Sequence, residues 1–304
     1  MRPSLAASLL VCLLAVSALS ARQAVAVVIS TGDGTGNTTA PPDDPGFANV
    51  GRSSNNLTGV YLGNRWVLTA AHVGERDFTF DGIFYEAVPG SRVVIDKGGT
   101  AADLAMVRLS GPPPPLPDLV LATAPIAVGE VATMIGNGWN REPNLTCWNV
   151  NWTELTCPAG VFNGYERLGS QRVLRWGSNE ITDVDLDVAG SGTDTRSFSA
   201  LFDEAGEPHE AQVVNGDSGG GVFVKRGGQW ELVGIHIAMG VFMSQPSQTV
   251  VFGNRTYATD VYYYKPEIEA ILATPVHVPL VPWPALLLLG GVVLGAARRA
   301  LPRR

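Results

Sequence analysis

Short runs of alternating apolar and polar residues, separated by turns that contain glycine, repeat through most of the chain. Residues 59–63 and 65–70 form one pair of runs around Gly63-Asn64, and residues 78–85 hold a second pair around Asp81-Gly82. Similar runs follow at 92–96, 104–109, 131–136, 172–176 and 181–187. Alternation with a period of two, bounded by Gly, Asn and Asp, indicates strands joined by tight turns. Long amphipathic helical patterns are rare, so the sequence predicts an all-β protein.

The two ends of the chain depart from this pattern. Residues 1–26 combine a positive charge at Arg2, an apolar run and the small-x-small site Ala24-Val25-Ala26, which is typical of a secretory signal peptide. Residues 275–304 contain a Pro-rich stretch, a wholly apolar run at 285–297 and closing arginines, which predicts a C-terminal transmembrane helix with its end in the cytoplasm. Between them we expect an N-terminal extension at 27–45 and one folded domain at 46–274, with a last helix at 266–272.

Composition narrows the classes of partner. The chain has 304 residues, so it can bury one large core or two smaller ones. Only 16% of the residues are charged and the net charge is −7, so there is no basic surface for nucleic acid. We therefore expect no nucleic-acid partner, and no pattern calls for a cofactor.

The cysteines point to an oxidising compartment. Cys12 falls in the apolar leader, which leaves Cys147 and Cys157 in an Asn- and Trp-rich insertion at 140–165. Two cysteines ten residues apart in an exported chain predict a disulfide, with two free thiols as the alternative. Neither cysteine has a second Cys or His at metal-ligand spacing. The insertion is either a loop that faces substrate or a surface addition, and the sequence does not decide between them.

Three acidic residues on one predicted strand raise the question of a metal. Asp183, Asp185 and Asp187 alternate along 181–187, so they share one face of the strand. A calcium site is conceivable, but the glycines and ligand spacing of a dedicated calcium loop are missing. A solvated strand face is the favoured interpretation, and we predict no metal site.

Three separate segments carry the candidate chemistry. Ser218 lies in Gly216-Asp217-Ser218-Gly219-Gly220, where flanking glycines allow a tight turn that exposes the hydroxyl and leaves backbone N–H groups free. His72 ends the run Leu68-Thr69-Ala70-Ala71, and Asp103 opens an apolar strand. Taken singly, the three could be a turn serine, a core histidine and a turn aspartate. In the chain order His, Asp, Ser they are the residue types of a catalytic triad.

These segments make the chain resemble the trypsin-like (chymotrypsin-fold) serine proteases. The matching blocks occur in the family's order: Trp66–His72, Asp103–Leu109, Gly136–Trp139, Gly216–Gly220, Trp230–Ile235 and Tyr257–Val261. The resemblance implies two six-stranded antiparallel β-barrels followed by a C-terminal helix. It also implies that His72 is the base, that Asp103 orients its ring, and that Ser218 is the nucleophile. The N–H groups of Gly216 and Ser218 would form the oxyanion hole. No cysteine flanks His72, so the resemblance is to bacterial members.

The same resemblance implies a substrate pocket. Counting back from Ser218 places Gln212 at the base of that pocket, which gives no preference for Arg or Lys because glutamine is neutral. The other residues that we expect around the pocket are Asn215, Ile237, Ala238 and Met239, with substrate pairing to the strand 235–239. His236 beside them is interpreted as structural.

Activation is where the sequence departs from the family. Trypsin-like zymogens are cut ahead of an Ile-Val-Gly-Gly-type start, and the freed amine pairs with the Asp that precedes the serine. Nothing near residues 27–45 matches such a site. We therefore predict that Asp217 is held in another way and that no tryptic cut is required.

Together these features predict an exported serine endopeptidase that acts on polypeptides. The tail at 275–304 resembles bacterial PEP-CTERM-type sorting tails, which a processing enzyme can remove, and a plain membrane anchor is the alternative. Either tail would display the protein outside the membrane, at the cell surface. The rival function is a catalytically silent trypsin-like binding module, which the unusual N-terminus and pocket strand would suit.

Overall fold

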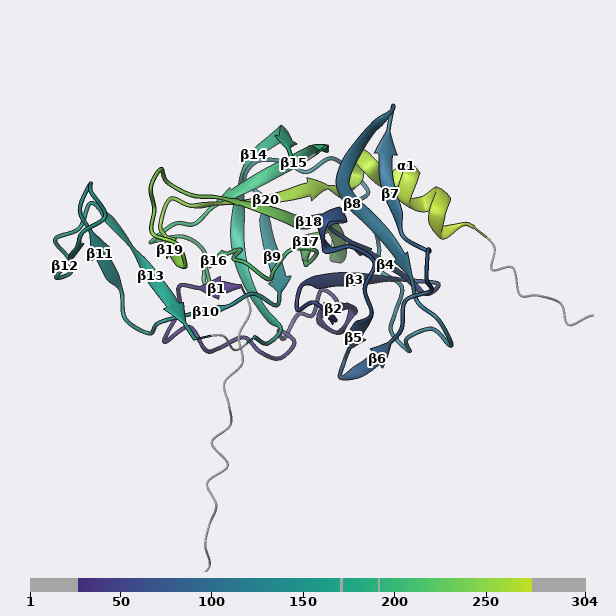
Figure 1. The fold of residues 1–304 in the computed structure, drawn as a ribbon, viewed down its shortest axis with the longest axis horizontal. Coiled ribbons are helices and arrows are strands. Elements are labelled where there is room, and N and C mark those ends of the chain that lie inside the picture. Colours follow the sequence, from purple (N-terminus) through teal and green to yellow (C-terminus); the bar gives the residue numbers. More distant parts are fainter. Residues whose placement is uncertain (1–26, 170–171, 191, 275–304) are drawn as a thin grey trace, which may run out of the picture. The chain divides into compact units, whose positions relative to one another are not determined.

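The computed structural model describes residues 27–169, 172–190 and 192–274 (Figure 1). The predicted signal peptide, transmembrane helix and sorting tail lie outside these residues. Within the described ranges, no helix is both long enough and apolar enough to cross a membrane. The described chain falls into one compact unit, which ends at Ile268, and a second unit, which begins at Glu269 and contains the end of the α-helix α1 (Val261–Leu272) and the two residues after it.

The first half of the compact unit is a seven-stranded antiparallel sheet. Its strands are β2 (Val50–Ser53), β3 (Thr58–Gly63), β4 (Trp66–Thr69), β5 (Phe78–Phe80), β6 (Ile83–Tyr85), β7 (Val93–Lys97) and β8 (Thr100–Arg108). They are hydrogen-bonded in the order β6-β5-β2-β3-β4-β8-β7. The β3–β4 and β5–β6 pairs confirm both predicted hairpins. Tyr61, Phe78 and Phe80 anchor an aromatic core on this sheet.

The second half is a closed six-stranded barrel. Its strands are β9 (Val131–Gly136), β14 (Arg175–Ala189), β15 (Asp194–Leu201), β17 (Gly221–Arg226), β18 (Gln229–Gly240) and β20 (Arg255–Asp260). The hydrogen-bonded order is β14-β15-β20-β18-β17-β9, and Figure 1 shows these strands side by side at the centre of the molecule. Alternate residues of these strands, among them Met134, Phe198 and Val222, fill the interior.

The expectation of two six-stranded barrels holds for the second half and differs for the first. The first sheet has seven strands, and its order is a path from β6 to β7 rather than a ring. The reason lies in β6, which pairs with β5 alone. Its residues Ile83 and Phe84 are 51% and 57% exposed, and no other strand of the described residues pairs with this edge.

Two smaller sheets complete the unit. The first contains β10 (Asn140–Arg141), β11 (Thr146–Trp148), β12 (Glu154–Leu155), β13 (Phe162–Leu168) and β19 (Thr249–Val251). The insertion is therefore folded into strands, at the left of Figure 1. The predicted disulfide between Cys147 and Cys157 is present, with Cα atoms 5.3 Å apart. The second small sheet pairs β1 (Val28–Ile29) with β16 (Ala211–Gln212).

The predicted N-terminal extension is packed against the unit. Val27, Val28 and Ile29, the first described residues of the chain, are at most 1% exposed. Because β1 pairs with β16, this segment lies against the strand that leads to Ser218.

The three strand aspartates are paired with arginines. Asp183 binds Arg255, while Asp185 and Asp187 lie 3.3 and 3.1 Å from the guanidinium of Arg196. Within the described ranges, no group of His, Cys, Asp and Glu side chains could hold a metal ion. The carboxylates form ion pairs on the strand face.

Candidate active site

His72 and Asp103 lie against each other where β4 of the first sheet ends. His72 is in the short 3-10 helix η2 (Ala71–Val73), directly after β4, and Asp103 is in β8. The ring Nδ1 lies 2.6 Å from Asp103 Oδ2, and the backbone N–H of His72 donates to Asp103 Oδ1 at 2.9 Å. One carboxylate therefore holds both the ring and the turn that carries it. With the proton on Nδ1, the free Nε2 can accept a proton.

A contact from the closed barrel fixes Asp103. Its backbone N–H donates to Thr195 Oγ1 at 2.8 Å, and Thr195 is a fully buried residue of β15. The Asp103 side chain is 19% exposed and that of His72 is 42% exposed. The pair is accessible from solvent, while its backbone support reaches into the core.

Two threonines connect Ser218 to the strand that ends at His72. Ser218 O accepts a hydrogen bond from Thr58 N at 2.9 Å, and Gly216 O accepts one from Thr58 Oγ1 at 3.0 Å. Thr69, three residues before His72, donates from Oγ1 to Thr58 O at 2.7 Å. Among the described residues, Ser218 Oγ has no hydrogen-bond partner. In unliganded hydrolases the contact between nucleophile and base is often long and tightens with substrate.

The turn around Ser218 presents two backbone N–H groups. Gly219 N donates to His236 O and Gly220 N to Asp217 O, each at 2.8 Å. The N–H groups of Gly216 and Ser218 have no acceptor in the described part of the chain. Gly216 has a φ of 114°, which favours glycine. These two donors are the pair that the sequence assigned to the oxyanion hole.

Asp217 is held by backbone amides. Its side chain is fully buried, Oδ1 accepts from Gly138 N at 2.6 Å, and Oδ2 accepts from Val214 N at 2.8 Å. Burial raises the pKa of Asp217 to about 7, although both N–H donors and two nearby arginines favour the charged form. Two backbone amides thus hold Asp217 in the described chain. That it needs no tryptic amine, and that no cut is required, stay predictions.

Two glycines make room for that carboxylate. A Cβ at Gly136 would lie 2.2 Å from Asp217 Oδ1, and a Cβ at Gly138 would lie 2.5 Å from Oδ2. Both distances are far below van der Waals contact. The sequence shows the block Gly136-Asn137-Gly138-Trp139. It does not show that the two glycines leave the space that Asp217 occupies.

Two buried arginines bind the N-terminal segment. Arg175 donates from Nε to Gly36 O at 2.6 Å, and burial lowers its pKa to about 10. Arg141 donates from Nε to Ile29 O at 2.7 Å and reaches further carbonyls of that segment. Its guanidinium also lies 3.9 Å from the ring centre of Tyr165. Sequence reasoning missed both arginines, because isolated arginines in strands carry no local signal.

The predicted pocket residues lie in different surroundings. Gln212 is 1% exposed, and its Nε2 donates to Val213 O and Arg255 O at 3.0 Å each. Asn215 is exposed, and Ile237 packs in a cluster with Ala70 and Val73, which flank the His72 turn. The partly buried Ala238 and Met239 follow in β18. Gln212 is therefore occupied by main-chain carbonyls, and the pocket assignment stays a prediction.

His236 lies directly behind the nucleophile turn. It is fully buried in β18, and burial lowers its pKa to about 3, so the ring is neutral at neutral pH. Neither ring nitrogen has a hydrogen-bond partner within the described ranges. The backbone of His236 accepts from Gly219 N and donates to Gly220 O at 2.9 Å. These bonds support the turn, as the structural interpretation expects.

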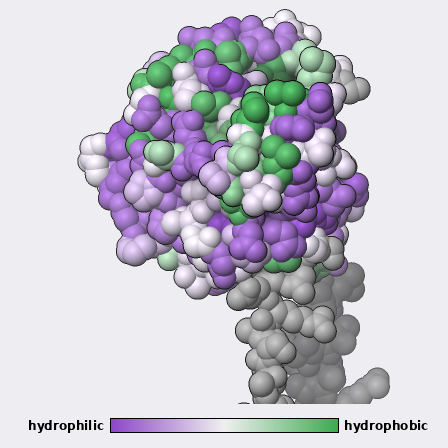
Figure 2. All heavy atoms as spheres, turned by 90° about the vertical axis from the view of Figure 1, so that its left-hand side faces the viewer, coloured by the Kyte–Doolittle hydropathy of each residue, from purple (hydrophilic) through white to green (hydrophobic). Residues whose placement is uncertain are grey.

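The insertion attaches to the loop that follows β18. Trp152 donates from Nε1 to Met243 O at 3.0 Å and stacks on Phe162 with centroids 4.3 Å apart, and Phe162 contacts Phe242. Figure 2 faces this end of the molecule and shows apolar side chains grouped at the surface. Met243, in the loop after β18, is 90% exposed. The insertion thus lies beside the end of the expected substrate strand.

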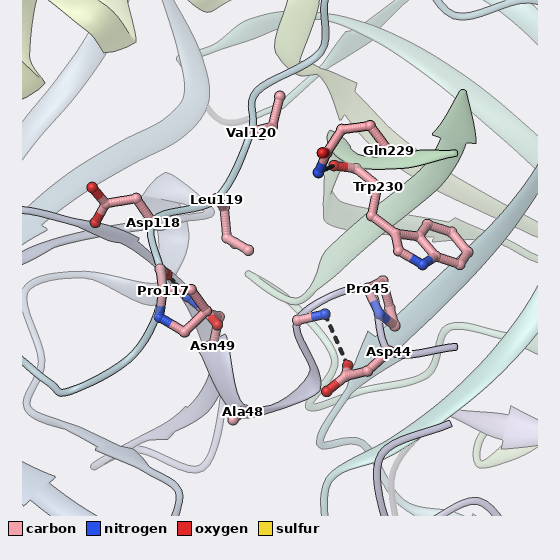
Figure 3. Close-up of a pocket in the computed structure, with 11 residues that line it drawn as sticks. Asp44, Pro45, Ala48, Asn49, Pro117, Asp118, Leu119, Val120, Gln229 and Trp230 are labelled. Carbon is pink, nitrogen blue, oxygen red and sulfur yellow. Dashed lines mark hydrogen bonds between the residues drawn. The ribbon is translucent and has the colours of Figure 1, made fainter. Parts of the chain in front are cut away.

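A separate pocket lies away from the triad (Figure 3). It is formed by residues 44–46, 48–49 and 117–120 and by Gln229 and Trp230 of β18. Asp44 points toward its rim and accepts hydrogen bonds from Gly46 N and Phe47 N. No triad residue lines this pocket, so it is not part of the candidate site.

Comparison with known proteins assigns the chain to a family. The family model of the trypsin-like peptidase domain matches residues 57–235, which include all three triad candidates. A comparison with curated protein sequences gives no significant match. Among solved structures, kallikrein-related peptidase 10 in complex with Zn²⁺ aligns with a TM-score of 0.48 and 17% identity, covering 75% of this chain and 97% of that one. The inactive form of the Rv3671c protease of M. tuberculosis H37Rv aligns with a TM-score of 0.42 and 18% identity, covering 74% of this chain and 89% of that one. On the family match, the chain belongs to the trypsin-like peptidase family.

Proposed function

We propose that the protein is an exported serine endopeptidase that cleaves polypeptides through an acyl-enzyme. The observation that carries this proposal is the 2.6 Å contact between His72 Nδ1 and Asp103 Oδ2, next to a glycine-flanked serine that threonines tie to the same strand. Membership in the trypsin-like peptidase family supports the same reaction.

The proposed reaction has two halves. His72 Nε2 removes the proton of Ser218 Oγ as that oxygen attacks the scissile carbonyl carbon, and Asp103 stabilises the imidazolium that forms. The negative oxygen of the tetrahedral intermediate receives hydrogen bonds from Gly216 N and Ser218 N. The intermediate then expels the amine, which takes the proton from His72. Water then attacks the ester in the same way, with His72 as the base, and releases the acid product and free Ser218.

The backbone donors carry a large share of this chemistry. Loss of one oxyanion donor in serine hydrolases costs about 100- to 1000-fold in rate. Here the turn that presents these donors is held by Asp217 through two backbone amides. We propose that this arrangement keeps the oxyanion hole formed without tryptic activation.

The location of the protein is part of the proposal. Residues 1–26 would direct export, and residues 275–304 would hold the domain at the outer side of the membrane. Processing of the tail by a sorting enzyme and permanent anchoring are both compatible with the sequence. The substrate would then be an extracytoplasmic polypeptide, with no nucleic acid involved.

A silent binding module is the second candidate. Two observations favour it: Ser218 Oγ is not hydrogen-bonded to His72 among the described residues, and Gln212 is tied to main-chain carbonyls. In such a protein the triad would persist without a pocket that admits a side chain.

A fluorophosphonate probe separates the two functions. The full chain, purified from membranes in detergent, should be labelled on Ser218, and the Ser218→Ala variant should not be labelled. Hydrolysis of a denatured protein substrate should disappear with the same substitution. A folded wild-type protein, shown by a cooperative melting transition, that neither labels nor hydrolyses would establish the binding module instead.

A further inference from the structure

Arg172 lies at the edge of the oxyanion hole. A Cβ on Gly216 would be 2.3 Å from Arg172 Nη1, so the guanidinium rests directly on the glycine Cα. Nη1 donates to Asn56 O at 2.7 Å, and Asn137 Nδ2 donates to the same oxygen at 3.4 Å. In the described ranges Arg172 has no carboxylate partner at salt-bridge distance. Part of its charge acts on the buried Asp217, but Arg172 forms no direct ion pair that would prevent a carboxylate of a bound molecule from contacting it.

The nucleophile turn has two different neighbours. On one side, β18 bonds to it through His236, whose backbone pairs with Gly219 and Gly220. On the other, Thr58 bonds to Ser218 O and Gly216 O. If the acyl half of the substrate pairs with β18, as the proposed function expects, the leaving half passes the segment Asn56–Thr58. Arg172 lies on this leaving-group side, because it binds Asn56.

A pocket with a mixed lining continues from Arg172. Its volume is about 290 Å³, and its polar lining residues are Arg172, Asn137, Arg52, Thr79 and Asp81, beside apolar residues such as Phe47 and Leu174. Arg52 is exposed and, like Arg172, forms no ion pair with another described residue. Two arginines against one aspartate give the lining an excess positive charge in a chain whose net charge is −7.

We propose that this pocket is a specificity site for the leaving half of the substrate and that it favours an acidic side chain. The residue concerned is the second or third after the scissile bond, since Arg172, which lines the pocket, lies beside Gly216 on the leaving-group side. A guanidinium matches a carboxylate in charge and in hydrogen-bond geometry. The proposal rests on the proposed function and adds a substrate preference to it.

The test uses one peptide in three versions. An internally quenched peptide that the full-length protein cleaves is made with Glu, Gln or Lys at the second and third positions after the cleaved bond. We expect kcat/KM to be about two- to fivefold higher for Glu than for Lys, the range that corresponds to partly exposed charge pairs. The ratio should fall at about 1 M salt, which screens such pairs.

Variants assign the preference to the arginines. In Arg172→Gln the Glu/Lys ratio should approach one, and in Arg52→Gln it should decrease. Each ratio is taken within one variant, so a general loss of activity through the oxyanion hole cancels. Arg65→Gln is the matched control, because Arg65 also donates to one carbonyl, that of Gly111, but lies in the β3–β4 turn and does not line the pocket. Its ratio should equal that of the wild type.

The outcomes keep the two proposals apart. A protein that labels with the fluorophosphonate but cleaves the Glu and Lys peptides equally retains the proposed function and overturns the leaving-group site. An unchanged ratio in Arg172→Gln also overturns it. A protein that neither labels nor cleaves any peptide removes the proposed function and the specificity site with it.

Discussion

Two aspartates support the candidate site, and they differ in burial and in the groups that they contact. Asp103 is partly exposed, and both its oxygens contact a single residue, His72. Asp217 is fully buried, and its oxygens contact the backbone of one distant segment, at Gly138, and of its own turn, at Val214. The first arrangement orients a side chain for proton transfer. The second fixes the shape of a turn.

The difference teaches where the site is sensitive. The base region, His72 and Asp103, belongs to neighbouring strands of one sheet, since β4 pairs with β8. The nucleophile region, Asp217 and Ser218, depends on glycines, buried arginines and the N-terminal segment. We therefore expect substitutions at the base region to affect chemistry with little loss of stability, and substitutions around the nucleophile region to affect both.

Asp103→Asn gives the largest expected effect and tests the first half of this contrast. An amide cannot hold the His72 tautomer that leaves Nε2 free, so kcat/KM should fall about 10⁴-fold. The melting temperature should change little, because the side chain is partly solvated. Peptide hydrolysis and thermal melting measure the two quantities. Asp187→Asn, at a solvated ion pair, serves as control, and an active Asp103→Asn enzyme would remove Asp103 from the mechanism.

Gly138→Ala tests the second half. The new Cβ would lie 2.5 Å from Asp217 Oδ2 and 2.6 Å from Val214 Cγ2, so the aspartate must move and the oxyanion donors with it. The rate of fluorophosphonate labelling should fall about 100- to 1000-fold, and unfolding should become easier by about 1–3 kcal/mol.

Gly36→Ala is the matched control for that substitution, because its Cβ would meet only Ile29 Cδ1 at 3.9 Å. Normal labelling and melting of Gly138→Ala would show that Asp217 does not determine the turn.

Arg141→Met sharpens the contrast by loosening the N-terminal segment. Arg141 is fully buried and donates to the carbonyls of Ile29, Ser30 and Gly32 at 2.7–2.9 Å. Removal leaves these acceptors unpaired, so the free energy of unfolding should fall by about 2–4 kcal/mol. Urea denaturation measures this, with Arg65→Met as the partly exposed counterpart. A change below about 0.5 kcal/mol would mean that the segment is not held by this residue.

The pH dependence of stability gives an effect that is spread over the range from pH 4.5 to about 7. Burial raises the pKa of Glu210 from 4.5 to about 7, and its carboxylate accepts from Asp203 N and Glu207 N. In this window the unfolded chain has lost the proton while the folded chain keeps it. Stability is therefore full below pH 4.5 and decreases, by at most about 1.4 kcal/mol per pH unit, as the pH rises to about 7. Above that value it levels off.

Glu210→Gln should flatten this slope. Asp217 titrates in a similar window, with its pKa raised from 3.8 to about 7, and it remains in both proteins. The difference between the urea midpoints of wild type and variant, followed from pH 4.5 to about pH 7, isolates Glu210. Parallel curves would show that Glu210 is ionised throughout.

The sequence predicted the base region better than the nucleophile region, for a physical reason. Both hairpins, the order of His72, Asp103 and Ser218, and the disulfide follow from local patterns of alternation, turns and spacing. The support of Asp217 does not, because Gly138 lies 79 residues from it in sequence. The seventh strand of the first sheet was missed for a similar reason, since a hairpin signal does not tell whether its outer arm joins a closed ring.

The disulfide lies entirely within the insertion. It joins β11 to the loop after β12, and neither cysteine belongs to a strand of the closed barrel or of the seven-stranded sheet. Production in a reducing bacterial cytosol would therefore leave the serine, histidine and aspartate supported by the same hydrogen bonds. Such material would lose the cross-link within the insertion beside β18. Recombinant protein made without oxidation would then react normally with small probes but cleave long polypeptides at a different rate.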